Sequence, residues 1–125
     1  MIFTLLMAVG EVFSATSYLN YGSALAASQQ DGKPMVVAFT ASWCGPCSKM
    51  KSSTLSDTEV KKELEDNFHF YLMDVDEQKA LSKKFGISSL PTLKVIDKTE
   101  KELDSQEGFQ SKGEFLNWIR KYKKK

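Results

Sequence analysis

Both cysteines of the chain lie in one short run, Trp43-Cys44-Gly45-Pro46-Cys47, just after a strand-length apolar segment. That segment, Met35 to Thr40, is almost continuously apolar, which is typical of a central strand buried on both faces. A helix is expected to begin within the run and to continue through Lys51. Its N-terminus favours the thiolate form of the first cysteine, Cys44. The pattern therefore predicts exchange between this pair of thiols and another disulfide.

Size and composition exclude several other classes of protein. The 125 residues suit one domain, and a net charge of +1 gives no field that would attract nucleic acid. Two cysteines are too few for a scaffold of several disulfides or for a zinc site. The lone histidine, His69, is expected inside a strand, so we expect no metal. The basic end, Arg120 to Lys125, is interpreted as a soluble helix terminus, with attraction to a membrane surface as the alternative.

The N-terminus allows two interpretations. Ile2 to Val9 is an apolar run of the length found in signal peptides, followed by small residues around Ser14 and Ala15. Against export, no Lys or Arg precedes the run, and the alternative is a short buried element of a cytoplasmic protein. We expect residues 1–16 to be a signal peptide or extension, residues 17–125 to form the domain, and the protein to be exported. No stretch approaches the ~20 apolar residues of a membrane-spanning helix.

The remaining periodicities predict an α/β fold. Helices and strands alternate, which indicates a mostly parallel sheet flanked by helices and finished by an antiparallel hairpin. The helix that begins in the Cys run is expected to falter at Ser52-Ser53-Thr54, because hydroxyl side chains compete for backbone hydrogen bonds. Capping boxes at Ser56 to Glu59 and at Ser111 to Glu114 open two more helices. The other elements are expected at residues 18–30 (helix), 68–75 (strand), 78–85 (helix), 92–96 (strand) and 102–105 (strand).

The Cys run and a second motif, Phe85-Gly86-Ile87-Ser88-Ser89-Leu90-Pro91-Thr92, together resemble the thioredoxin superfamily. The resemblance covers residues 17–125 and implies the thioredoxin fold. Gly32 to Met35 and Thr54 to Val60 are similar to the exported thioredoxin-like reductases, most of all to the C-terminal domain of the thiol–disulfide interchange reductase.

The resemblance also implies a set of site residues. Pro91 would be a cis-proline facing the two cysteines, and the Leu90 backbone would pair with an extended substrate chain. Thr92, Gly108 and Phe109 would complete the substrate groove. The alternatives are a trans proline at a strand start for Pro91 and simple packing for Phe109.

Within the run, each residue has an expected task. Cys44 is the nucleophile that forms a mixed disulfide, and Cys47 resolves it. Gly45 lets a substrate backbone approach, and Pro46 fixes the turn. Trp43 is expected at the rim, and the alternative for the whole pair is an inert structural bridge.

One departure from the family concerns the buried carboxylate that thioredoxins usually carry beneath the second cysteine. Alignment through Phe39 and Cys44 puts Ala38 at that position, and Leu72 replaces its usual lysine partner. The loss of both is self-consistent, because an unpaired buried lysine would be costly. The family's general-base role is therefore not carried over to this chain.

These features together predict a protein-disulfide reductase that cycles between dithiol and disulfide. The alternatives are a disulfide oxidase or isomerase on the same fold, and a non-catalytic binding or chaperone module. We expect disulfide-containing protein substrates, an upstream reductase as electron donor, a monomer, and neither stable membrane insertion nor a bound organic cofactor, since the cysteine pair is itself the redox group.

Overall fold

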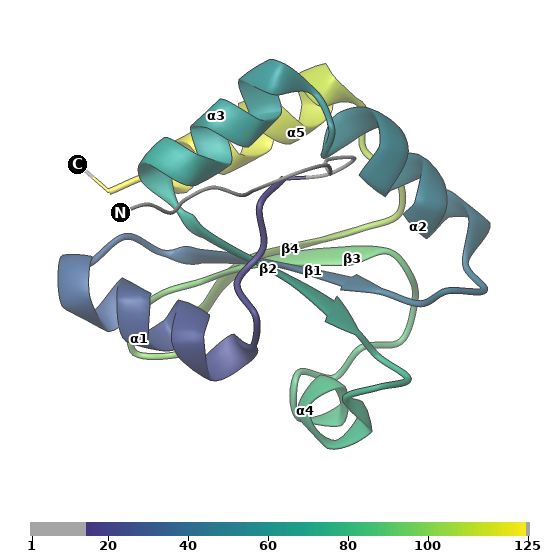
Figure 1. Cartoon of the computed structure of the whole chain (residues 1–125), viewed down its shortest axis with the longest axis horizontal. Coiled ribbons are helices and arrows are strands. Elements are labelled where there is room, and N and C mark those ends of the chain that lie inside the picture. Colours follow the sequence, from purple (N-terminus) through teal and green to yellow (C-terminus); the bar gives the residue numbers. More distant parts are fainter. Residues whose placement is uncertain (1–14, 125) are drawn as a thin grey trace, which may run out of the picture.

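Four strands form the central sheet (Figure 1). In the computed structural model, which describes residues 15–124, they are β1 (Met35–Thr40), β2 (His69–Asp74), β3 (Thr92–Ile96) and β4 (Glu102–Glu107). Their order is β2-β1-β3-β4. The pairing of β1 with β2 is parallel, whereas β1 with β3 and β3 with β4 are antiparallel.

The sheet is mixed, as expected, but the expectation that it is mostly parallel is wrong. Alternation of helices and strands does not reveal this, because β3 starts at the end of the sheet where β1 finishes, with Thr92 opposite Phe39. A strand that enters there must run against β1.

Helices cover both faces of the sheet (Figure 1). On one face lie α1 (Tyr21–Asp31) and α4 (Lys79–Lys84), and on the other α2 (Gly45–Lys49), α3 (Thr58–Asn67) and α5 (Lys112–Ile119). Successive residues of β1 alternate between the two cores: Val36 and Ala38 face the α3 and α5 side, and Val37 and Phe39 face the α1 side. The predicted central strand, buried on both faces, is confirmed.

Capping side chains mark where α1 and α5 begin. The first helix starts at Tyr21 rather than near Tyr18, because Asn20 caps it at the Ser23 amide and the Tyr18 amide is already bonded to the Phe70 carbonyl. The predicted capping box at Ser111 and Glu114 is confirmed.

The cap predicted at Ser56 is wrong. Asp57 caps α3 instead, and its carboxylate accepts from the amides of Glu59 and Val60. The Ser56 hydroxyl instead donates to the Lys51 carbonyl at 2.6 Å, which directs its side chain back toward the preceding turn.

The helix that carries the cysteines does not falter at residues 52–54. After α2 the chain continues as a π-helical segment, η1 (Met50–Thr54), in which the Leu55 amide donates to the Met50 carbonyl at 2.9 Å. The hydroxyl of Ser53 bonds back to the Lys49 carbonyl at 2.6 Å. The wider turn accommodates the hydroxyl-to-backbone bonds that the prediction treated as helix-breaking.

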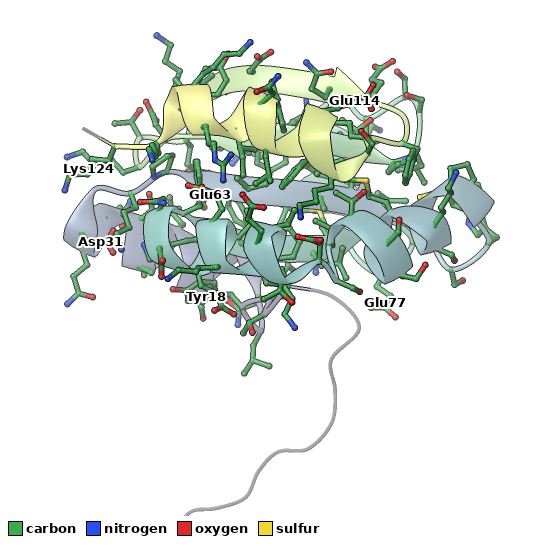
Figure 2. The ribbon with its side chains drawn as sticks, turned by 90° about the horizontal axis from the view of Figure 1, so that it is seen from above. Tyr18, Asp31, Glu63, Glu77, Glu114 and Lys124 are labelled. Carbon is green, nitrogen blue, oxygen red and sulfur yellow. A yellow bond between two sulfur atoms is a disulfide. The ribbon has the colours of Figure 1, made fainter. Side chains whose placement is uncertain are left out.

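The C-terminal end is fastened to both layers by charged side chains (Figure 2). Glu63 of α3 points toward the end of α5, where a short 3-10 helix, η2 (Arg120–Tyr122), follows. Arg120 Nε donates to Glu63 Oε1 at 2.9 Å. Lys124 Nζ donates to the carbonyl of Asp31, at the end of α1. Two of the basic residues at this end therefore have partners inside the domain.

At the other terminus, Ala15 is already 3% exposed and packs in the core. Most of the predicted signal peptide or extension, residues 1–14, lies outside the described residues. Within residues 15–124, none of the helices has the length and apolar character needed to cross a membrane.

Candidate active site

The two cysteines lie where β1 gives way to α2. The Cys44 amide donates to the Ala41 carbonyl at 3.2 Å, which turns the chain out of the sheet. Cys44 is then the cap of α2, and its Sγ accepts from the Cys47 amide at 3.2 Å. The sulfurs of Cys44 and Cys47 form a disulfide. An amide directed at Cys44 Sγ favours negative charge on that sulfur when the bond is reduced.

The two sulfurs differ in their access from outside. Cys44 lines a surface groove of about 700 Å³, which we call the Cys44 groove; Trp43, Pro46 and Leu90 line it as well. Cys47 does not line this groove and is 1% exposed, against 6% for Cys44. The arrangement allows Cys44 to attack a partner, while Cys47 lies behind Cys44 in the interior.

Pro91 faces the buried side of the pair. Its peptide bond with Leu90 is cis, and it lines a small hollow together with Cys47. Its carbonyl accepts from the Gly108 amide at 2.8 Å. Gly108 has a φ of 91°, a value that glycine adopts without strain. Leu90 packs against the cluster formed by Ala41, Cys44 and Cys47, and it lines the Cys44 groove.

Trp43 stands at the rim of the groove and is 70% exposed. Its Nε1 donates to Asp76 Oδ2 at 2.7 Å, which holds the ring over the loop that follows β2. The ring therefore forms a wall of the groove and is positioned by a side chain from a different element.

The other predicted groove residues lie elsewhere. Thr92 is 2% exposed, and its hydroxyl donates to the Ser89 carbonyl at 2.7 Å. Phe109 lines a separate hollow, and Lys49 Nζ lies 4.4 Å from the centre of its ring. Sequence reasoning instead missed the wall formed by α4 and its neighbours: Val75, Lys79, Ser82, Lys83 and Ile87. The available signal was the short amphipathic helix just before the second motif.

Among residues 15–124, no carboxylate lines the hollow beside Cys47. Ala38 is opposite Leu72 in the pairing of β1 with β2, as the alignment implied. The residues around the hollow shared by Cys47 and Pro91 include Lys51 but neither Asp nor Glu among the described residues. The hydroxyl of Thr40, buried in the same lining, makes no hydrogen bond within residues 15–124.

His69 takes part in a separate polar cluster (Figure 2 labels two of its members, Tyr18 and Asp31). Its ring nitrogens lie 2.7 Å from Tyr18 Oη and 2.9 Å from the Asp31 carboxylate. Desolvation acts to raise the pKa of Asp31, but hydrogen bonds from His69 and from the Lys33 amide outweigh it and lower this pKa. In the described part of the chain, no three His, Cys, Asp or Glu side chains are gathered to hold a metal ion.

Comparison with known proteins settles the family. The family model described as Thioredoxin matches residues 14–121. The chain belongs to the thioredoxin family. The thioredoxin of Rickettsia prowazekii (strain Madrid E) is 38% identical over 88 residues, which cover 70% of this chain and 80% of that protein. A thioredoxin structure from Thermus thermophilus superposes with a TM-score of 0.76 at 29% identity, covering 86% of each chain.

A second group of similar proteins consists of disulfide interchange proteins. The chain is 29% identical over 113 residues to the thiol:disulfide interchange protein DsbD of Neisseria meningitidis, covering 87% of this chain and 19% of that protein. The oxidised C-terminal domain of Neisseria meningitidis DsbD superposes with a TM-score of 0.70 at 27% identity, covering 82% of this chain and 91% of the domain. The predicted thioredoxin fold is therefore confirmed. Family membership and the Cys44–Cys47 disulfide identify the protein as a thiol–disulfide oxidoreductase.

Proposed function

We propose that this thioredoxin-family protein reduces disulfides in partner proteins. The observation that carries the proposal is the unequal placement of the two sulfurs: Cys44 lines an open groove, and Cys47 lies behind it, 1% exposed. The Gly45-Pro46 pair between the cysteines is the pair that thioredoxins carry, and it supports the reducing direction. Thioredoxin, at about −270 mV, is far more reducing than the oxidant DsbA, at about −120 mV.

In the proposed reaction the Cys44 thiolate attacks one sulfur of a partner disulfide, and the other partner sulfur leaves as a thiolate. Cys47 then loses its proton and attacks Cys44 Sγ. This step breaks the mixed disulfide and releases the second partner sulfur. Two electrons pass from the cysteine pair to the partner, and the Cys44–Cys47 disulfide remains. An upstream reductase would return the two electrons.

Several parts of the site would support this exchange. The amide of Cys47 stabilises the Cys44 thiolate. Leu90 lines the groove, and its amide and carbonyl make no hydrogen bond within the described residues. An extended partner chain could therefore pair with it, as in strand addition. No organic cofactor is needed, since the cysteine pair carries the electrons.

We further propose that the protein works as a monomer outside the cytoplasm. The apolar run from Ile2 to Val9 supports export. Cell fractionation, with N-terminal sequencing of the mature protein, tests the location. Recovery in the cytoplasm with Met1 intact would contradict it.

A redox titration of the cysteine pair in glutathione or dithiothreitol buffers tests the direction of exchange. A reversible two-electron transition near or below roughly −230 mV supports reduction of partners. A value near −120 mV would make the protein an oxidase. The variant C47S should accumulate a mixed disulfide through Cys44, whereas C44S should not. Full activity of the double variant C44S/C47S would instead indicate a binding module.

A further inference from the structure

The charge of the Cys44 groove comes from one helix. The charged side chains among its described lining residues are Lys79 and Lys83, both exposed on α4, while the rest of the lining is apolar or carries hydroxyls. Lys79 and Lys83 are four residues apart, so they project from the same side of the helix. They therefore form a basic wall beside Cys44.

Neither lysine is paired with a carboxylate within residues 15–124. Other lysines of the domain do form ion pairs: Lys62 with Asp66, Lys84 with Glu100, and Lys94 with Glu102. Three acidic residues precede α4: Asp76 accepts from the Trp43 indole, Asp74 accepts from the amides of Asp76 and Glu77, and Glu77 is exposed. All three keep their charge, but none of them lines the Cys44 groove. The basic wall is thus available to a ligand.

We propose that the Cys44 groove selects disulfides flanked by acidic residues, with Lys79 and Lys83 as the specificity-determining pair; this inference rests on the proposed reductase function. A partner segment extended along Leu90 would direct alternate side chains toward α4. Lys79 and Lys83 are about 6 Å apart along the helix axis. Alternate residues of an extended chain are separated by about 6.6 Å. Acidic residues at two alternate positions therefore match the spacing of the basic wall.

The size of the effect follows from the exposure of both lysines. Exposed ion pairs contribute modestly and are screened by salt, so two of them should change kcat/KM about 3- to 10-fold at low salt. The difference should shrink toward unity at about 1 M salt, where screening acts over about 3 Å.

The test measures the reduction of three matched disulfide peptides by an excess of the reduced full chain. The second-order rate constant takes the place of kcat/KM, because no donor regenerates the dithiol. The peptides differ only at two alternate positions beside the cysteine, which are Glu, Gln or Lys. We expect this rate constant to fall from Glu to Gln to Lys, about 3- to 10-fold at each step. In K79E/K83E the order should reverse, and in K79Q/K83Q the three rates should converge.

A matched control changes the charge of the whole molecule by the same amount away from the groove. Lys98 and Lys101 are exposed and lie in the turn between β3 and β4, at the opposite end of the sheet. K98E/K101E should keep the wild-type order of the three peptides. If this control reverses the order, the preference belongs to net charge and the inference is wrong. Equal rates for the three peptides in the wild type would also overturn it.

The same experiment separates failure of this inference from failure of the proposed function. Reduction of all three peptides at one rate retains the reductase and rejects the basic wall as a specificity element. No reduction of any peptide, in a preparation whose cysteine pair is shown to be reduced by thiol labelling, rejects the reductase function and this inference with it. K79Q/K83Q adds no new charge and so provides a reading if K79E/K83E does not fold.

Discussion

At the scale of single residues, the side chain that most sets this chain apart is the methyl group of Ala38. It is 3% exposed and faces the hollow beside Cys47. Where thioredoxins usually carry a carboxylate, this chain buries an apolar group against Leu72. In the proposed reaction, the proton of Cys47 must therefore leave by another route when Cys47 attacks the mixed disulfide.

Restoring the carboxylate should destabilise the protein. In A38D the burial of the carboxylate should raise its folded-state pKa above the unfolded value of about 3.9. The folded protein then holds the proton more tightly, so the penalty is absent below about pH 4 and grows as the pH rises through the folded pKa. A rise of about two units costs about 2.7 kcal/mol at pH 7.

The measurement is urea unfolding of A38D and of the matched variant A38N between pH 4 and pH 8. Both variants add bulk, but only A38D adds a titrating group. The gap between their free energies of unfolding should widen with pH. A constant gap would mean that the new carboxylate remains hydrated or finds a cation such as Lys51.

Some functional residues were predictable from the sequence and others were not. Cys44, Cys47 and Pro91 could be singled out because each belongs to a short motif whose chemistry is local. Lys79 and Lys83 could not, because they reach the groove only after α4 has packed against the sheet. Asp57 rather than Ser56 caps α3, because the Ser56 side chain is turned back to donate to the Lys51 carbonyl of the preceding turn.

At the scale of elements, the π-helical segment η1 is the feature that a sequence pattern described least well. The hydroxyl residues of η1 were expected to end the helix, yet one of them, Thr54, anchors η1 to a neighbouring segment. Thr54 is 2% exposed, and its hydroxyl donates to the carbonyl of Gln110 at 2.5 Å. This bond ties the helix that carries Cys47 to the segment that leads into α5.

Removing this bond should weaken the protein measurably. T54V keeps the shape of the side chain but leaves the Gln110 carbonyl without its partner in a buried region, which costs about 1–3 kcal/mol. The matched control is S53A, which also removes a hydroxyl-to-backbone bond from η1, but at an exposed position. S53A should change the free energy of unfolding by less than about 0.5 kcal/mol.

Urea unfolding followed by the fluorescence of the tryptophans measures both variants. Equal losses in T54V and S53A would show that the contact with Gln110 contributes nothing beyond the local hydroxyl bond.

Strand positions were predictable, and so were a parallel pair in the sheet (β1 with β2) and the final antiparallel hairpin (β3 with β4). The direction of β3 against β1 was not, for a physical reason. Met35–Thr40 and Thr92–Ile96 agree with the prediction to the residue, because an apolar β-rich run records burial. Direction depends on which end of the sheet the chain has reached, and no periodicity carries that information. The antiparallel pairing of β3 with β1 therefore had to come from the structure.

At the scale of the whole molecule, acidic side chains with lowered pKa values are distributed over the surface. Hydrogen bonds and nearby cations lower the pKa of Asp31, Asp57, Glu59, Asp97, Glu100 and Asp104. For each, the folded pKa lies below the unfolded one, so its contribution is complete above the unfolded value and is lost as the pH falls through the folded value.

We therefore expect the free energy of unfolding to vary little on account of these carboxyls between pH 6 and pH 8 and to fall below about pH 4. In D104N the free energy of unfolding should fall less steeply below about pH 4, because hydrogen bonds from Tyr122 and Trp118 are the main causes of the lowered Asp104 pKa. Urea titrations at pH 3, 5 and 7 measure this. An acid limb as steep in D104N as in the wild type would contradict the assignment.

The redox state of the cysteine pair and the free energy of unfolding of the whole molecule are linked in one thermodynamic cycle. Reduction potential and folding stability exchange at about 1.4 kcal/mol per 30 mV for a two-electron couple. DsbA is a strong oxidant because its reduced form is the stabilised one, so a reductase should show the opposite order. Here the disulfide closes only a short loop, since Cys44 and Cys47 are three positions apart, and chain entropy limits its contribution to about 2 kcal/mol.

We expect the oxidised protein to melt at or above the temperature of the reduced protein, by up to about 8 °C. C44S/C47S should melt close to the reduced form, because both lack the cross-link. Calorimetry with and without a thiol reductant measures the difference. A reduced form that melts well above the oxidised one would mean that the fold stabilises the dithiol, which would make the protein an oxidant. The redox titration would then have to give a potential nearer −120 mV, so the two experiments check each other.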